Sequence, residues 1–493
     1  MDISETNAYG TKQPKGTATT LIDLVSRDIQ DNTLFPLNAS VTRFTRDEGL
    51  RTIPMSSVMR EFTFRGPASL GQTFTFELGD INCGDLLSGL FIQIQLSDWF
   101  PTSLRYLLST NTIIPVDPEE HWTYCNSLGT SILEEATLEV DDQVLERITG
   151  DSIHVTSLLF PDLNTQVGLF DIIGYKTMDQ IKADDGLRAF FTEDGWITVP
   201  LMFSMLRERT TATFPLIACR NGTMRIRVTL KKFDQLVRIK SGSRNSCNDT
   251  PVSKTFRLSD SRLSIDRIKP FTSFTNQPPL KHIQLLTQGI FVDGPYREML
   301  LRQPFERPFR EIQQFDFTEP LKYVVNKSGN DIITVQLPLE ANQPVEEIVW
   351  ILRRKASVSL NNDWINYSAT LEKDYDPTFA PLEPLLISAK IQANGQDIIS
   401  QNESWFRSHI ARAHKGGKVS YDSFVYGYSF ARHPGQHDPT GSMNASRLSS
   451  LRLSLDVKPP GGASDTEWEV HVFVFAFQWV RFGNGICNKV FID

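Results

Sequence analysis

Apolar and polar residues alternate in many short stretches of the chain from about residue 38 onward. In the stretch 224–230, Met, Ile, Val and Leu alternate with Arg and Thr, and the same period of two recurs at 74–78 and 451–457. Because successive side chains of a strand point to opposite faces, this pattern predicts strands with one buried face. The stretch 472–480 is apolar at almost every position, which predicts a strand covered on both faces.

Turn signals divide these stretches at short intervals, for example at Asn221-Gly222 and Asn394-Gly395, whereas clear helical periodicity is scarce. The stretch 237–258 is polar and contains several Ser and Asn residues, so it predicts a long exposed loop rather than part of a core. The pattern as a whole indicates an all-β protein.

With 493 residues, the chain is too long for a single hydrophobic core, so at least two domains are expected. Pro295 and the segment 302–309 break the strand pattern past the middle of the chain. The 32 phenylalanines, 27 prolines and 29 glycines suit many short strands joined by turns. We therefore predict two sandwiches joined at about 295–308, made rigid by packed apolar cores rather than by polar networks.

Charge and cysteine content exclude several classes of function. The net charge is −8 and no run of five or six like charges occurs, so nothing predicts direct binding of nucleic acid. The N-terminus lacks the apolar core of a signal peptide and no run of about 18 apolar residues follows, which predicts a chain made and used in soluble form. Five widely spaced cysteines without a CxxC pair predict reduced thiols rather than disulfides or a zinc knuckle: Cys83, Cys125, Cys219, Cys247 and Cys487.

Residues 1–37 predict an N-terminal arm. The first twenty residues are polar and rich in Gly and Thr. An amphipathic piece follows, in which Leu21, Leu24 and Val25 share one helical face. That face either caps the chain's own domain or makes a contact during assembly, and these three residues are our candidate assembly contacts.

Segments spread over nearly the whole chain, in the expected order, resemble the major capsid proteins of the nucleocytoplasmic large DNA viruses. The longest similar motif begins with Tyr124-Cys125-Asn126-Ser127-Leu128-Gly129 and ends with Gly150-Asp151. Inside it, Asp141-Asp142 replaces the family's usual Gly-Gly, an exchange that keeps turn chemistry. Further similar segments lie at 199–201, 214–218, 290–293, 342–350, 391–395 and 426–447.

The resemblance implies two consecutive eight-stranded jelly-roll sandwiches with inserted loops, a double jelly roll. The implied domains are an arm (1–37), a first jelly roll (38–294), a linker (295–308) and a second jelly roll (309–493). It also implies a homotrimer, a pseudo-hexameric capsomer that tiles the icosahedral shell of a large DNA virus. Implied partners are neighbouring capsomers, minor capsid and penton proteins, and internal viral membrane proteins. The implied location is the virion, with assembly in the host cytoplasm and no enzymatic activity.

Two other functions stay open at this point. A scaffold protein of the same fold would shape an immature viral membrane and then leave. A carbohydrate-binding or cupin-like jelly-roll protein is less consistent with the sequence, because a cupin needs a converging His/Glu metal triad and the histidines here are scattered.

Two segments match chemical motifs only weakly. The HxxxH spacing of His433 and His437, near Asp438, His409 and His414, would suit a metal on a helix, but the neighbouring prolines and glycine favour an ordinary loop. The run His414-Lys415-Gly416-Gly417-Lys418 lacks the first glycine and the final Ser/Thr of a phosphate loop. The acidic pairs Asp184-Asp185 and Glu346-Glu347 predict solvated surface. We therefore predict no catalytic, metal or cofactor site.

Seven N-x-S/T sequons are candidate glycosylation sites, although chance matches in a surface rich in Asn, Ser and Thr explain them more readily. They lie at Asn38, Asn221, Asn248, Asn326, Asn366, Asn402 and Asn444.

Overall fold

The computed structural model divides the chain into two units, Met1–Pro54 and Met55–Asp493, and all elements named below belong to the second. It describes residues 53–79, 83–96, 104–107, 112–115, 120–179, 195–207, 213–244, 251–256, 280–318, 332–371, 378, 381–414, 423–436, 438–458 and 467–491. In these ranges, helices are all too short or too polar to cross a membrane. Leu21, Leu24 and Val25 lie outside the described residues.

The first half of this unit forms a sandwich of two four-stranded antiparallel sheets. One sheet has the order β1 (Met55–Thr63), β13 (Leu280–Val292), β3 (Leu86–Leu96), β9 (Trp196–Pro200). The other has the order β2 (Thr73–Leu78), β10 (Met224–Leu230), β7 (Leu133–Val140), β8 (Gln143–Thr149). Their facing side chains, such as Ile92 from β3 and Ile226 from β10, are buried in one hydrophobic core.

The second half repeats this arrangement. One sheet has the order β14 (Phe305–Phe317), β22 (Trp468–Gly483), β16 (Pro344–Arg354), β19 (Tyr426–Ser429), with β20 (Met443–Asn444) and β23 (Ile486–Lys489) at its margins. The other has the order β15 (Ile333–Pro338), β21 (Leu451–Val457), β17 (Leu386–Ala393), β18 (Gln396–Asn402). A second core that includes Trp350 and Leu453 lies between them.

The two sandwiches have the same topology. If the eight sandwich strands of either half are counted in chain order, their sheets read 1-8-3-6 and 2-7-4-5. This is the double-sheet arrangement of two Greek keys that defines a jelly roll. The predicted fold of two consecutive eight-stranded jelly rolls is therefore confirmed.

Individual strands also follow the predicted patterns. In β10 the residues Met224, Ile226, Val228 and Leu230 are buried, while Arg227 between them is exposed. β2 alternates strictly between exposed and buried residues, and 472–478 of β22 are buried on both faces. The Asp141-Asp142 exchange keeps its turn, since both residues have positive φ as the tight β7–β8 hairpin requires.

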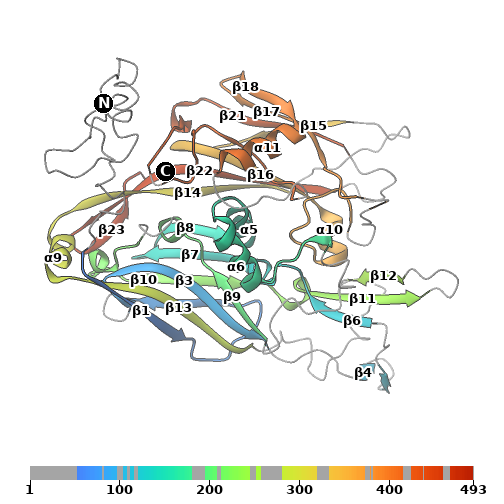
Figure 1. Cartoon of the computed structure of the whole chain (residues 1–493), viewed down its shortest axis with the longest axis horizontal. Helices are drawn as coiled ribbons and strands as arrows, with labels where there is room; N and C mark the ends of the chain where they lie inside the picture. The colour runs from blue at the N-terminus through green and yellow to red at the C-terminus, as the bar shows by residue number, and fades with distance from the viewer. Residues whose placement is uncertain are drawn as a thin grey trace, which may run out of the picture. The chain divides into compact units, whose positions relative to one another are not determined.

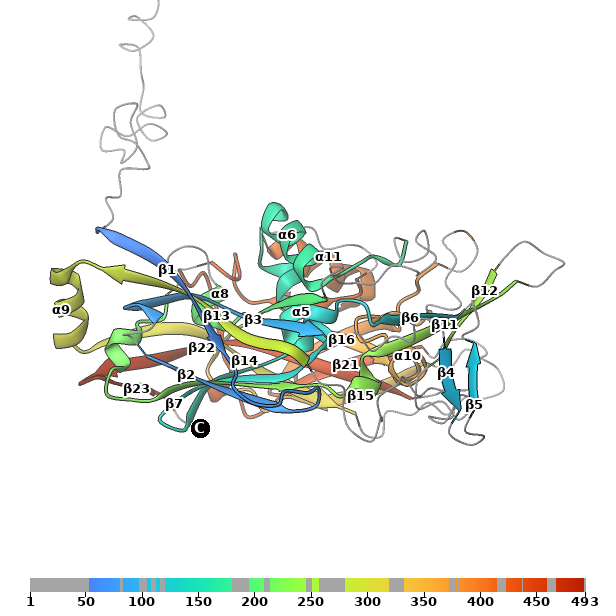
Figure 2. The same ribbon diagram turned by 90° about the horizontal axis from the view of Figure 1, so that it is seen from below.

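The polar stretch 237–258 contains strands where a loop was predicted. β11 (Val237–Arg244) pairs with β12 (Pro251–Phe256) and with β6 (Glu120–Tyr124). Figure 2 places this ribbon at one end of the molecule, together with the hairpin of β4 (Leu104–Leu107) and β5 (Thr112–Pro115). The prediction was wrong because a ribbon outside the sandwiches is held by its backbone hydrogen bonds, which leave no apolar pattern in the sequence.

The predicted linker 295–308 is structured. Pro295 occupies the first turn of helix α9 (Gly294–Arg302), where its missing N–H costs nothing. Pro308 pairs with Trp479 inside β14, which is the edge strand of its sheet and so tolerates a proline. β14 begins at Phe305, inside the predicted linker, so the prolines mark a helix start and an edge strand rather than a break. The domain division itself stays a prediction.

In each sandwich, a helix follows the fifth strand in chain order. Helix α5 (Gly150–Leu159) follows β8 and is continued by α6 (Leu163–Ile173), while α11 (Glu403–Ala413) follows β18. Shorter helices are α4 (Leu128–Ser131), α8 (Ser204–Arg207) and α10 (Lys355–Asn361), and the 3-10 turns are η1 (Leu216–Cys219), η2 (Phe233–Gln235) and η5 (Ala445–Arg447). Figure 1 shows α5 between the sheets of the first half, near β7 and β8, and those of the second half, near β16. This position gives α5 its role in the site described next.

Candidate functional site: the seam between the two halves

The two jelly rolls exchange parts across a shared boundary, which we call the seam. Helix α5 belongs to the first half, yet its Val155, Leu158 and Leu159 are buried in the second core. In return, Val480 and Phe482 of β22 and Cys487 of β23 are buried in the first core. Since each core is completed by residues of the other half, separating the halves would expose apolar surface of both.

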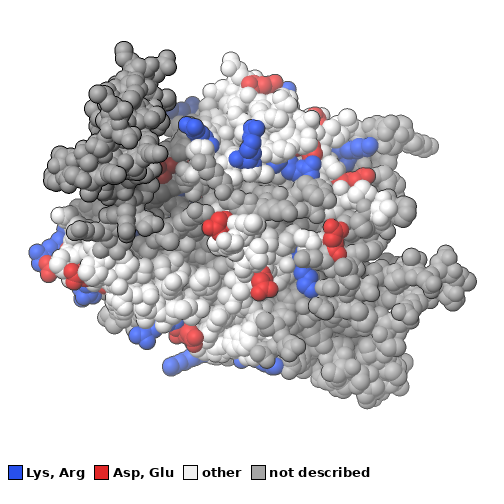
Figure 3. Space-filling view, in the orientation of Figure 1, with Lys and Arg blue, Asp and Glu red and all other residues white. Residues whose placement is uncertain are grey.

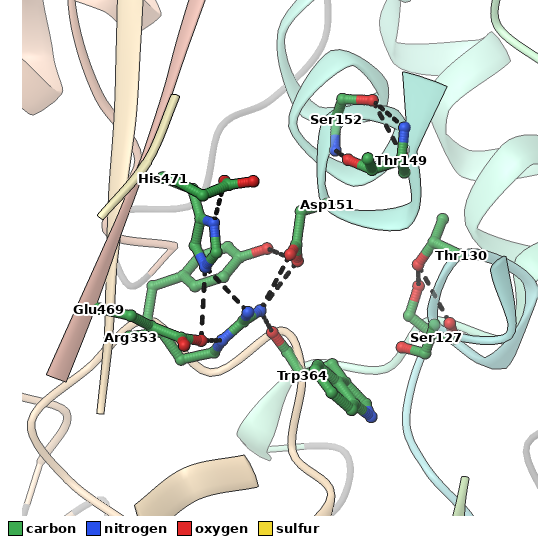
Figure 4. A network of polar contacts seen from close by, with 12 residues as sticks. Ser127, Thr130, Thr149, Asp151, Ser152, Arg353, Trp364, Glu469 and His471 are labelled. Atoms are coloured by element: carbon green, nitrogen blue, oxygen red, sulfur yellow. Dashed lines mark hydrogen bonds and ion pairs between the residues drawn. The ribbon is translucent and has the colours of Figure 1, made fainter. Parts of the chain in front are cut away.

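An ion network lies inside the seam, with Arg353 of β16 at its centre (Figure 4). Arg353 Nη1 donates to both carboxylate oxygens of Asp151, at 2.9 and 3.2 Å, and to the carbonyl of Trp364 at 2.8 Å. Its Nε donates to Glu469 of β22 at 2.6 Å. The Arg353 side chain is only 3% exposed. Asp151 stands in the first turn of α5, so this pair joins the first half to the second where the helix dipole also favours a negative charge.

His471 and two polar side chains close a ring back to the start of α5. His471 Nδ1 lies 2.6 Å from Asp316 Oδ1, and its Nε2 faces Glu469 Oε1 at 3.4 Å. Gln314 Nε2 donates to Asp316 at 2.8 Å. Thr149, the N-cap of α5, donates from Oγ1 to Gln314 Oε1 at 2.8 Å. The network therefore crosses the seam twice, at Thr149 and at Asp151.

Burial and pairing set the charge states of this network. Burial alone would raise the pKa of Asp151 and Glu469, but Arg353 and His471 outweigh it and hold both pKa values low, that of Glu469 at about 2. Burial would lower the pKa of His471, whereas Asp316 and Glu469 raise it to about 9. Arg353 Nη2 lies 3.0 Å from His471 Nε2, so two cationic side chains are close together. The carboxylates of Asp151, Asp316 and Glu469 balance their charge.

Trp364 and Lys231 extend the seam beside Arg353. The indole Nε1 of Trp364 donates to the carbonyl of Gln235 in the first half at 2.8 Å. Lys231 Nζ lies over the same indole ring, 3.7 Å from its centroid, a cation–π contact. Burial lowers the pKa of Lys231 to about 8, although Asp151 opposes this shift.

A second buried ion pair, between Arg310 of β14 and Glu346 of β16, lies within the second half and is tied to the first half by a hydrogen bond from the Arg310 backbone. Arg310 donates from Nε to Glu346 Oε2 at 2.5 Å, and also contacts the carbonyl of Gln436. Its backbone N–H donates to Ser204 Oγ of the first half at 2.8 Å, and the Ser204 N–H donates to Glu146 of β8 at 2.7 Å. Burial raises the pKa of Glu346 even though Arg310 opposes it.

The prediction that Glu346-Glu347 is solvated surface was therefore wrong. Both side chains are fully buried, and Glu347 lies 2.8 Å from His414 Nε2. Buried carboxylates require partners, and here the partners come from distant parts of the chain. The expectation of a rigid structure without polar networks is corrected in the same way. Asp184-Asp185 lies outside the described residues.

Thr149→Ala tests one crossing of the seam. The substitution removes the cap that accepts from Ser152 N and the hydrogen bond to Gln314. We expect the free energy of unfolding in urea to fall by about 1–2 kcal/mol. Asn402→Ala is the matched control, because Asn402 caps α11 by accepting from Trp405 N within the second half. If both variants lose equal stability, the Thr149–Gln314 bond contributes nothing across the seam.

Comparison with known proteins identifies the family. The family described as "Major capsid protein N-terminus" matches residues 55–268, and that described as "Large eukaryotic DNA virus major capsid protein" matches 311–487. The major capsid protein of Phaeocystis pouchetii virus is 21% identical, over 86% of this chain and 91% of its own length. The chain belongs to the family of major capsid proteins of large eukaryotic DNA viruses.

Solved structures agree on the double jelly-roll fold of this capsid protein. A chain of the PBCV-1 virus capsid superposes with a TM-score of 0.61 at 15% identity, covering 90% of this chain and 98% of that one. The Faustovirus major capsid protein superposes with a TM-score of 0.60 at 12% identity, covering 94% and 96%. Because the family is structural, the prediction that the chain is not an enzyme is confirmed.

The predicted sites of the capsid protein are scattered rather than convergent. His409 stacks on Trp405, His414 pairs with Glu347, and His433 lies in a loop where its backbone contacts Thr440. Among described residues, no three His, Cys, Asp or Glu side chains are arranged to hold a metal ion. His437 lies outside the described residues. Residues 415–418, the remainder of the run that weakly resembles a phosphate loop, also lie outside them.

The sequons fall into three groups. Asn221, Asn402 and Asn444 are exposed, so they stay candidates for glycosylation. Asn366 is 5% exposed and its amide donates to the carbonyl of Thr370, so it is not accessible as a glycan acceptor. Asn38, Asn248 and Asn326 lie outside the described residues.

One signal in the sequence pointed to the seam. The stretch 472–480 is apolar on both faces, whereas a sandwich strand needs only one apolar face. In the structure its second face is covered by the seam, for example by Phe160, whose ring lies 5.4 Å from that of Phe475. The ion pairs themselves gave no sequence signal, because Asp151 and Arg353 are 202 residues apart.

Proposed function

We propose that three copies of this capsid protein form a homotrimeric, pseudo-hexagonal capsomer that tiles an icosahedral virion shell. The observation that supports it is the repeat of one strand order, 1-8-3-6 and 2-7-4-5, in both halves of a single compact unit. Two similar jelly rolls in each of three copies give six similar blocks around one axis. Such a ring approximates a hexagon, the shape that tiles a flat face.

The seam supports the proposal because a tile must keep its shape. Shared cores and the buried Asp151–Arg353 ion pair fix the two jelly rolls to each other, so three rigid subunits can meet with a defined geometry. Apolar side chains also remain exposed on the described surface, among them Met59 of β1 and Leu163 and Val167 of α6. Leu163 and Val167 are four residues apart on α6 and so share one helix face, which offers an apolar spot for a subunit contact.

We further propose that neighbouring capsomers, minor capsid and penton proteins and internal viral membrane proteins are its partners. On the face seen in Figure 3, acidic and basic side chains are scattered rather than gathered by sign. Mixed charges suit many moderate protein contacts better than the neutralisation of a phosphate backbone.

Light scattering coupled to size exclusion tests the trimer. We expect a particle of three times the 55.9 kDa of one chain, and averaged electron micrographs that show a hexagonal outline. A particle that stays monomeric at high protein concentration would contradict the proposal. Quantitative mass spectrometry of purified mature virions then separates a shell protein, which is abundant there, from a scaffold, which is depleted.

A further inference from the structure

The last strand of the chain is held against the first half next to a cysteine. Cys219 ends the 3-10 turn η1, and Cys487 lies in β23. The backbone N–H of Asn221 donates to the carbonyl of Gly485 at 2.9 Å, and its side-chain Nδ2 donates to the carbonyl of Asn484 at 2.8 Å. These bonds fix the turn before β23 onto the loop after η1, which brings the two cysteines together.

The two thiols are in contact inside the first core. Cys219 is 3% exposed and Cys487 is fully buried, and both are free thiols in this structure. Their side chains are hydrogen-bonded to each other, which together with burial raises the pKa of Cys219 well above its ordinary value. The Cys219 thiol is therefore protonated and slow to react at neutral pH while β23 stays in place.

We propose that Cys219 and Cys487 are an oxidative modification site, a thiol pair that closes to a disulfide and ties the C-terminal strand covalently to the first jelly roll. The proposal goes beyond the shell function and does not depend on trimer formation. The sequence alone did not suggest this thiol pair, because 268 positions separate Cys219 from Cys487. Only the fold places them side by side.

The oxidant that this site takes is a small disulfide such as oxidised glutathione. One cysteine thiolate attacks the sulfur–sulfur bond of the oxidant, forms a mixed disulfide and releases one glutathione thiolate. The second cysteine thiolate attacks the protein sulfur of that mixed disulfide, forms the Cys219–Cys487 bond and releases the second glutathione. The protein loses two protons and two electrons, and the oxidant is reduced to two thiols.

The bond is expected to stabilise the subunit because it closes a long loop. Cross-linking restricts the unfolded chain, and the restriction grows with the number of residues between the two cysteines. For a loop of this length in a unit of this size we expect the melting temperature to rise by about 5 °C. The subunit would then be more resistant in an oxidising medium than in a reducing one.

The test oxidises the purified full-length chain with glutathione disulfide, in urea below the unfolding transition so that β23 can open. Free thiols are then alkylated and the protein is mapped by non-reducing mass spectrometry. We expect five thiols before and three after oxidation, a peptide pair joining Cys219 to Cys487, and a rise in melting temperature that dithiothreitol reverses.

Cys219→Ser and Cys487→Ser are the matched variants. Each should fold with an unchanged circular dichroism spectrum and lose both the linked peptide and the rise in melting temperature. Glutathione adducts without the internal link in the unsubstituted chain, or a link between other cysteines, would overturn the site. A Cys219–Cys487 bond that leaves the melting temperature unchanged or lower would overturn its stabilising role.

Discussion

Arg353→Met is expected to lower the free energy of unfolding by about 3–5 kcal/mol. The substitution keeps most of the side-chain volume but removes the charge that holds Asp151 and Glu469, at 2.9 and 2.6 Å. Both carboxylates are largely buried, so they would remain without their main counter-charge in a poorly solvated site. Urea unfolding followed by tryptophan fluorescence measures the loss.

Arg481→Met provides the matched control. Arg481 lies in β22 and pairs with Glu306 of the neighbouring strand β14 at 2.6 Å, but the pair is 64% and 42% exposed. Exposed ion pairs contribute less than about 1 kcal/mol, so this variant should be nearly as stable as the parent chain. Adding Asp151→Leu to Arg353→Met should restore part of the stability. Equal small losses in Arg353→Met and Arg481→Met would show that the network does not hold the seam.

The jelly-roll strands were predictable because burial on one face imposes a period of two. β2 and β10 face one core and solvent, so the alternation of Phe74, Phe76 and Leu78, or of Ile226 and Val228, follows from the fold. Helix α5 was not predicted, because its burial is not confined to one face. Nine of its ten residues are buried, so no polar face remains to produce a helical period.

From the sequence, the seam could be predicted only indirectly, as an unidentified cover for one strand. The apolar run 472–480 indicated that something covers the second face of β22, but not which element does so. Glu346-Glu347 looked like surface because their partners, Arg310 and His414, are far away along the chain. Both pairs form within the second half, between segments that only the fold brings together, and a single sequence carries no record of that.

The seam explains why two jelly rolls in one chain act as one block. A flexible linker would let the halves rotate, whereas α5 in the second core and β22 in the first oppose rotation in both directions. The buried Asp151–Arg353 ion pair also fixes the position of one half relative to the other, because an apolar interface alone would let the two halves slide. Rigidity at this boundary is what the proposed capsomer requires.

Acidification between pH 6.5 and 4.5 is expected to weaken the seam through His154. This histidine lies in α5 between the rings of Tyr175 and Tyr367, at 5.4 and 6.1 Å, and no described residue offers its Nδ1 a hydrogen bond. Burial lowers its pKa to about 4, although Asp151 opposes the shift. The unfolded chain then binds more protons than the folded one, so stability falls as the pH drops below about 6.5, by about 2–3 kcal/mol at pH 4.5.

His471 acts in the opposite direction. Its pKa is raised to about 9, so its stabilisation is complete below pH 6.5 and is lost as the pH rises through 9. The pKa of Glu469 is lowered to about 2, so its contribution is present above about pH 4.5 and is lost only below the window in which His154 titrates. Burial and Arg412 also lower the pKa of His409, so the acid limb above pH 4.5 reports both histidines, and a substitution at His154 isolates its share.

His154→Phe separates this titration from the others. Phenylalanine keeps an aromatic ring between the two tyrosines but cannot bind a proton, so urea midpoints between pH 7.5 and 4.5 should change by less than half the parent's change. His282→Gln, at a half-buried histidine of β13 bonded to Gln284, should keep the parent's acid limb. An acid limb as steep in His154→Phe as in the parent would assign the effect to another group. The buried imidazole would then be only a packing element of the seam.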